Sequence, residues 1–299
     1  MKDRAATDTS HAWTRYWDTA PKEFSGCLPG APAVVTDFMA EIWIEFFTGL
    51  PQQTRLLDLG TGGGAVLLLA HSRRSDLFLT GVDYAHSLPD LGNSIIMIPQ
   101  TNLTGLPFAE KSFDAITSQF ALEYAPRTEA VNELKRVLTD DGQYLLFCHH
   151  AESVILEHNT TRLAAIQDIL AGKGLINSAL KIIRNRKLLD PKSRKRLGRL
   201  LQTLHTRHPE QPIVTEVSGD IARKMTDPDN LKQLLSLQQN LKMEGQRISA
   251  LKSSALTRFQ AESLAQQLSD TGGPAPQLEE ICLPGTSTPL AWKISKISS

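Results

Sequence analysis

The amino-acid sequence predicts an α/β fold in which a doubly wound, mostly parallel sheet of seven strands carries a helical insert. Between residues 55 and 148, short apolar segments alternate with helical patterns, as in parallel strands joined by right-handed crossovers. The alternation stops at about residue 152, and nearly everything to residue 268 has helical spacing. Strand character returns only in residues 277–297, so we expect the C-terminus to complete the sheet.

Each element has its own signal along the chain. Apolar residues at helical spacing predict a helix over residues 33–47, and a turn at Asp140-Asp141-Gly142 precedes the fifth strand. Helices are also expected at residues 62–72 and 128–138, and strands at residues 55–59, 77–82, 95–98, 113–117, 143–148, 277–283 and 289–297. This order divides the chain into an N-terminal helical cap or lid (1–54), a ligand-binding core (55–150), a helical insert (151–255) and a C-terminal completion of the sheet (256–299).

Composition limits the function classes. The chain has 299 residues, and its 32 Lys+Arg balance 32 Asp+Glu, which argues against a uniformly basic nucleic-acid binder and against an acidic solvating chain. The balance is a cancellation, because residues 1–150 carry 11 basic and 18 acidic residues, whereas residues 151–299 carry 21 and 14. The three cysteines form no C-x-x-C pair, so neither disulfides nor a metal site is expected. With no apolar signal core and no apolar run of about 20 residues, a soluble, cytoplasmic protein is expected.

A glycine-rich loop is the sharpest local signal. The strand ending in Asp58-Leu59 runs into Gly60-Thr61-Gly62-Gly63-Gly64, and a helix follows. Glycines permit a tight turn and a close approach of a ligand, and the N–H groups of the helix N-terminus favour an anionic group. The next strand ends at Asp83, whose carboxylate can accept hydrogen bonds from two ribose hydroxyls.

Three interpretations of the loop remain. Gly60, Gly62 and Ala65 satisfy the dinucleotide pattern G-x-G-x-x-G/A. S-adenosylmethionine is the second candidate, because Asp58 would repel a pyrophosphate but suits the ammonium of a methionine group. A glycine turn that holds no ligand is the third.

The glycine loop, Asp58-Leu59-Gly60-Thr61-Gly62-Gly63-Gly64, resembles the first motif of the class I S-adenosylmethionine-dependent methyltransferases with a methyltransferase type 11-like core. Residues 102–108, 112–116 and 134–143 resemble three later segments of that family, in order and at suitable spacing. The resemblance covers about residues 53–150 and, more loosely, the last 40 or so. It implies a Rossmann-like fold, S-adenosylmethionine as cofactor and methyl transfer as activity.

The resemblance also implies which residues bind the cofactor. Asp58 would position the methionine ammonium, Asp83 would bind the ribose, and three glycines would pack on the cofactor, namely Gly60, Gly62 and Gly64. Asn102 stands where the family usually has Asp, and its amide oxygen can still accept a hydrogen bond from the adenine amine. The remaining contacts would come from Leu103, a backbone N–H and apolar wall, and from Gln119 and Phe120, near the sulfonium.

Few residues are expected to take part in the chemistry itself, because methyl transfer needs a base only when the acceptor arrives protonated. His149 or His150, after the fifth strand, is a candidate base or substrate contact; a structural histidine is the alternative. Glu123 and Tyr124 are candidates for a substrate role, or else solvated loop residues. The candidate catalytic set is His149, Glu123 and Tyr124. Tyr16 and Trp17 could close a lid over the cofactor or simply cap the core.

The segment from Lys181 to Arg207 carries ten Lys+Arg and one acid, Asp190. It could be a solvated face, a docking face for an acidic partner such as an acyl carrier protein or a carboxylate-bearing substrate, or a contact for RNA phosphates. It contains no aromatic residue for stacking on bases. The sequence therefore predicts a methyltransferase for a small or carrier-bound metabolite, at oxygen. An RNA methyltransferase and a non-catalytic cofactor-binding subunit are the alternatives.

Overall fold

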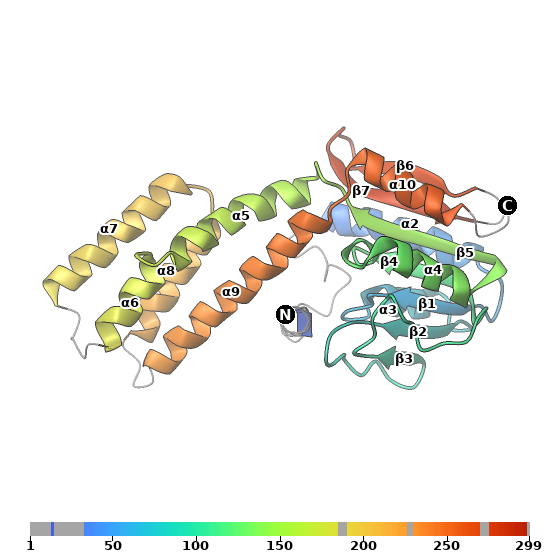
Figure 1. Cartoon of the computed structure of the whole chain (residues 1–299), viewed down its shortest axis with the longest axis horizontal. Coiled ribbons are helices and arrows are strands. Elements are labelled where there is room, and N and C mark those ends of the chain that lie inside the picture. Colours follow the sequence, from blue (N-terminus) through green and yellow to red (C-terminus); the bar gives the residue numbers. More distant parts are fainter. Residues whose placement is uncertain (1–12, 15–32, 185–189, 226–229, 270–274, 298–299) are drawn as a thin grey trace. The chain divides into compact units, whose positions relative to one another are not determined.

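The structure is a computed structural model that describes residues 13–14, 33–184, 190–225, 230–269 and 275–297. The chain forms two compact units, which we call the core unit (Met1–Leu156 with Ser253–Ser299) and the helical unit (Glu157–Lys252). The core unit holds the sheet, and the helical unit consists of helices alone (Figure 1).

The core unit is built on one sheet of seven strands in the order β3-β2-β1-β4-β5-β7-β6. The first five of these pair in parallel, whereas β7 is antiparallel to both β5 and β6. The predicted α/β fold with a mostly parallel seven-stranded sheet is confirmed. The strands are β1 (Arg55–Leu59), β2 (Phe78–Val82), β3 (Ile95–Ile98), β4 (Phe113–Gln119), β5 (Leu138–His149), β6 (Gln277–Cys282) and β7 (Pro289–Lys296).

Helices cover both faces of this sheet. Successive strand residues point to opposite faces, so Leu56 of β1 packs with α2 (Ala33–Gly49) and α3 (Ala65–Arg73). Leu57, the next residue, packs with α4 (Arg127–Val137) and α10 (Arg258–Leu268) on the other face. Burial on both faces explains why the strands are almost continuously apolar rather than alternating.

The fifth strand differs from its prediction. The sequence Asp140-Asp141-Gly142 predicts a turn that ends before the strand, but β5 already begins at Leu138. Phe113 of β4 pairs with Leu138, and two residues later Ala115 pairs with Gln143, so the three predicted turn residues form an irregularity inside the strand pair. Turn-forming residues in the sequence cannot show that the chain pairs with β4 both before and after them, because that pairing is a tertiary contact.

The helical unit has a hydrophobic core of its own. Its elements are α5 (Val154–Leu170) and α9 (Asn230–Ser254), each of which begins or ends in the core unit, and α6 (Leu175–Arg184), α7 (Pro191–Arg207) and α8 (Pro212–Lys224). Seventeen buried residues, among them Ile166, Leu204 and Leu234, form this core. Among the described helices of both units, none is long and apolar enough to cross a membrane.

Candidate functional site

The candidate site lies at the edge of the sheet where four parallel strands end. Leu59 of β1 pairs with Val82 of β2 and with Ser118 of β4, and Gln119 of β4 pairs with Phe147 of β5. Since these strands end together, the polar residues that follow them are brought to one edge, although they are far apart in the chain. This is the edge at which open α/β sheets bind ligands.

The glycine loop is held in a conformation that side chains would prevent. Gly60, Gly62 and Gly64 have φ values of 69°, 50° and 77°, in the left-handed region that favours glycine. A Cβ on Gly60 would lie 2.1 Å from Cβ of Ala121. These conformations also delay the helix, which begins at Ala65 rather than at the predicted residue 62.

Asp58 is a buried carboxylate at the end of β1. Its residue is 1% exposed, and its Oδ1 accepts a hydrogen bond from the hydroxyl of Thr117 on β4 (2.8 Å). No described cation pairs with it. Burial is the main cause that raises the pKa of Asp58 to about 7, and the nearby carboxylate of Asp83 adds to it. A buried carboxylate that lacks a cation fits a ligand that brings an ammonium group.

Asp83 is a buried carboxylate that organises the glycine loop. Its Oδ2 accepts a hydrogen bond from the N–H of Gly62 (2.9 Å), and its Oδ1 accepts one from the N–H of Ala85 (2.8 Å). Burial raises the pKa of this carboxyl, and these backbone N–H groups oppose the rise. Each oxygen keeps further acceptor capacity for ribose hydroxyls. The contact to Gly62 was not predicted from the sequence.

An arginine of α4 holds the loop of residues 102–108 through hydrogen bonds to its backbone. Arg136 donates hydrogen bonds to the carbonyl oxygens of Phe108 (2.7 Å) and Leu106 (3.0 Å), and it forms a two-bond ion pair with Glu133. Glu133 in turn accepts from the N–H of Leu106 (2.6 Å), and the hydrogen bond to Arg136 lowers the Glu133 pKa. Asn102, at the start of this loop, is exposed, and its Oδ1 accepts from the N–H of Thr104 (3.1 Å).

The substitution Arg136→Ala is expected to weaken cofactor binding without touching the cofactor. Two carbonyl oxygens and Glu133 lose their donor, which costs about 1–3 kcal/mol of stability and loosens the loop that holds Asn102 and Leu103. Thermal unfolding and calorimetric titration with S-adenosylmethionine measure both effects. Arg136→Lys is the matched control: it keeps the charge but cannot replace the planar set of donors, so it should behave like alanine. A lysine variant with wild-type affinity would contradict this explanation.

Gln119 and Phe120, both predicted to lie near the sulfonium, have different surroundings in the structure. Gln119 is buried, and its Oε1 accepts a hydrogen bond from Nε1 of Trp43 on α2 (2.6 Å). Phe120 has a φ of 57°, unusual for a bulky residue, and its ring lies 4.4 Å from the ring of His149. Strain of this kind is often found at functional sites. The cofactor roles of both residues remain predictions.

Glu123 and His149 form a buried pair. Oε1 of Glu123 lies 2.6 Å from Nδ1 of His149 and also accepts from the backbone N–H of His149 (2.8 Å). The side chains of Glu123 and His149 are 0% and 7% exposed. Glu123 belongs to η2 (Leu122–Tyr124), just after β4, whereas His149 ends β5. The structure therefore brings together two candidates that are 26 residues apart, and Glu123 is not a solvated loop residue.

Aromatic rings surround this pair. Tyr124 packs edge-on against His149 with ring centroids 5.8 Å apart, and Trp13 packs edge-on against Tyr124 at 5.4 Å. The neighbour of Trp13, Thr14, accepts a hydrogen bond from the N–H of His86, shortly after β2. Tyr16 and Trp17 lie outside the described residues, so their role as a lid stays a prediction.

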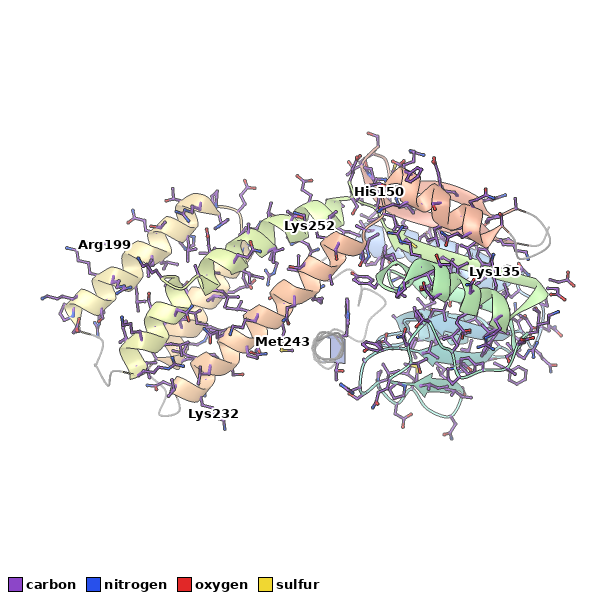
Figure 2. The ribbon with its side chains drawn as sticks, viewed as in Figure 1. Lys135, His150, Arg199, Lys232, Met243 and Lys252 are labelled. Carbon is purple, nitrogen blue, oxygen red and sulfur yellow. The ribbon has the colours of Figure 1, made fainter. Side chains whose placement is uncertain are left out.

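His150, the other candidate histidine, is engaged elsewhere. Its ring stacks on Trp292 of β7 at 4.4 Å, and its Nδ1 accepts from the N–H of Glu152 (2.9 Å). Burial lowers the pKa of His150, although Glu280, 3.8 Å from its Nε2, opposes that effect. These contacts correspond to the structural alternative. Figure 2 labels His150 at this position.

Sequence reasoning missed several residues that shape the site. Thr117 and Arg136 carried only weak signals, a polar residue in a buried strand and a basic residue near a helix end. Trp13 belongs to the aromatic entry, but nothing in the sequence shows that it contacts Tyr124. Among the described residues, no group of three or more His, Cys, Asp or Glu side chains could hold a metal ion.

The sheet order and the polar residues at its edge are those of an open, doubly wound α/β fold. Residues 57–146 match the family model described as the methyltransferase domain. This part of the chain is a class I S-adenosylmethionine-dependent methyltransferase domain.

Similar proteins are methyltransferases as well. The chain is 30% identical over 124 residues to the uncharacterized methyltransferase YcgJ of Bacillus subtilis (38% of this chain, 48% of that protein). It is 30% identical over 120 residues to the ubiquinone/menaquinone biosynthesis C-methyltransferase UbiE of Geotalea uraniireducens (36% and 47%). It is 26% identical over 147 residues to the malonyl-acyl-carrier protein O-methyltransferase of Geobacter sulfurreducens (47% and 55%). The chain thus spans about half the length of these relatives.

Proposed function

We propose that this protein transfers a methyl group from S-adenosylmethionine to a hydroxyl oxygen of a small or carrier-bound metabolite. The observation that carries the proposal is the buried pair of Glu123 and His149 at the ligand edge of the sheet. A base is needed only where the acceptor arrives protonated, as a hydroxyl does.

The pair has the geometry of a base and the group that orients it. A carboxylate accepts hydrogen bonds, so Nδ1 of His149 carries the hydrogen toward Glu123 and Nε2 keeps a lone pair. In our proposal Nε2 takes the proton of the acceptor hydroxyl, and Glu123 stabilises the imidazolium that results. The Glu123 side chain is fully buried behind this pairing with His149, so we assign it a positioning role.

The residues at the ends of β1 and β2 would hold the cofactor. Asp58 would pair with its ammonium group and Asp83 with its ribose, while the glycine loop allows close approach. When bound, S-adenosylmethionine supplies an electrophilic methyl group on a good leaving group. The rings of Phe120, Tyr124 and Trp13 would exclude water from the acceptor.

The names of the relatives include methyltransferases for different acceptor atoms, which is why the proposal covers both small and carrier-bound acceptors. One is named as a C-methyltransferase of quinone biosynthesis and one as an O-methyltransferase of an acyl-carrier protein derivative. We favour oxygen because of the pair of Glu123 and His149. We also favour a small or carrier-bound acceptor over RNA, because the most basic segment of the chain, residues 181–207, contains no aromatic residue for stacking on bases.

Incubation with methyl-labelled S-adenosylmethionine and a set of matched acceptors tests the proposal. The set contains phenols and aliphatic alcohols, their methyl ethers, and the corresponding amines, each free and as a thioester on an acyl carrier protein. We expect label on a hydroxyl oxygen and none on the ethers. Label on carbon or nitrogen would contradict the proposed acceptor. Tight cofactor binding without transfer to any of these or to a cell extract would favour a non-catalytic subunit.

A further inference from the structure

One face of α7 carries a row of positive charges that form no ion pair with any described residue. Lys192, Lys195, Arg196 and Arg199 are all exposed and stand at helix positions i, i+3, i+4 and i+7. A helix rises about 1.5 Å per residue, so the row is about 10 Å long. We call these four residues the α7 basic stripe; Figure 2 labels Arg199 on it.

No described acid neutralises the α7 basic stripe. Asp190, the acid beside it in the sequence, accepts a hydrogen bond from the N–H of Ser193 (2.7 Å) and so caps the helix. Asp168 pairs instead with Arg207 and His208, at the far end of α7. None of the four stripe residues forms an ion pair with another described residue.

The position of the stripe works against the stability of the helix. Three of its four charges lie in the first six residues of α7, where the helix dipole disfavours cations. Lys192 and Arg196, and likewise Lys195 and Arg199, are like charges four residues apart, which repel. This clustering of cations costs stability and is not needed to keep the helix solvated. An anionic partner would offset the repulsion between the cations, so the clustering favours a binding face.

The packing and composition of the helical unit argue against two kinds of anionic partner for α7, a membrane and a nucleic acid. The opposite face of α7, with Leu204 buried and Leu197, Leu200 and Leu201 partly buried, packs into the unit's own core, so it is not available to enter a membrane. Residues 157–252 contain no Phe, Tyr or Trp, so they offer no ring for stacking on bases.

We propose that the α7 basic stripe docks an acidic helix of a carrier protein that presents the methyl acceptor. A helix with carboxylates at the same spacing matches the stripe in length and in charge. The inference rests on the proposed function and deepens it, because it names the partner that brings the acceptor. Electrostatic docking of this kind acts mainly through the association rate and weakens with salt.

Fluorescence anisotropy with a labelled apo acyl carrier protein tests the docking surface. The triple variant K192E/K195E/R199E should lose at least about tenfold in affinity at low salt, since three favourable contacts become repulsive. The control variant K232E/K242E/K252E changes three exposed lysines of α9 and the net charge by the same amount, and it should bind like the wild type. Figure 2 labels Lys232 and Lys252.

Two further readouts separate docking from folding and from catalysis. The α7 variant should unfold at the same or a higher temperature, because glutamates in the first turns suit the helix dipole. It should also methylate a free small acceptor at the wild-type rate, so failure of the proposed function and failure of the docking surface give different results. Equal losses in both triple variants, no binding by the wild type, or tighter binding to a 20-nucleotide RNA or to phosphatidylglycerol vesicles would overturn the proposal.

Discussion

Replacement of His149 by alanine is expected to lower kcat by about 10²- to 10⁴-fold, the usual contribution of a positioned general base. The affinity for S-adenosylmethionine should change less than kcat, because the proposed role of the imidazole is to take the acceptor proton and not to bind the cofactor. Single-turnover kinetics with the hydroxyl acceptor measure the effect. His158→Ala, which removes an exposed histidine of the helical unit, is the control and should leave kcat unchanged.

Glu123 should show a different signature, because it acts through His149. Glu123→Gln keeps the size of the side chain but removes the charge that stabilises an imidazolium, so kcat should fall and the pH profile of kcat should shift. The double variant with both Glu123→Gln and His149→Ala should be no slower than His149→Ala alone, because the effects of residues that act as a unit are not additive. A His149→Ala variant with wild-type kcat would remove the basis of the proposed mechanism.

Replacement of Asp58 by asparagine is expected to weaken S-adenosylmethionine binding and yet stabilise the free protein above neutral pH. The folded-state pKa of Asp58 is about 7, above the value of 3.8 for an exposed Asp. The folded state therefore binds more protons than the unfolded state between these values, and stability falls as pH rises from about 4 to about 7. The full loss is about 4 kcal/mol, and asparagine, which cannot ionise, avoids it. Thermal unfolding of both forms at pH 5 and pH 8.5 measures the difference.

Cofactor affinity should depend on pH in the opposite sense. Only the ionised carboxylate attracts an ammonium group, so wild-type affinity should rise with pH up to about 7 and then level off. Calorimetry with methylthioadenosine, which lacks the ammonium, should show no such rise, and Asp58→Asn should abolish it. Asp37→Asn, an exposed residue of α2, is the matched control. An Asp58→Asn variant that binds S-adenosylmethionine as tightly as the wild type would show that the site is assigned wrongly.

Most strands could be predicted because each is a short apolar run bounded by polar or turn-forming residues. The strand at residues 95–98 is observed with the predicted bounds, since its apolar run stands between polar segments. The helix after the glycine loop begins three residues late, because φ values above zero at the glycines are incompatible with a helix. The helical unit spans 157–252, inside the predicted insert of 151–255. Its role as a substrate lid remains a prediction.

The site was predictable in its residue types but not in its contacts. Asp58, Asp83 and His149 stand at strand ends, and in a parallel sheet these ends share one edge. The sequence could not show that Gln119 would bond to Trp43 or that Arg136 would hold the loop of residues 102–108. Such contacts depend on which way a side chain leaves its strand or helix.

The sequence by itself determined the class of fold, the glycine loop and the separation of charge, because these follow from local conformational limits, apolar periodicity and composition. Only the tertiary structure decided that Glu123 meets His149 and that Thr117 meets Asp58. Each contact joins residues that lie on neighbouring strands or directly after them, 26 and 59 positions apart in the chain, with Glu123 in η2 just after β4. Its distance is set by the register of the sheet, and that register depends on the packing of both faces together rather than on any one segment.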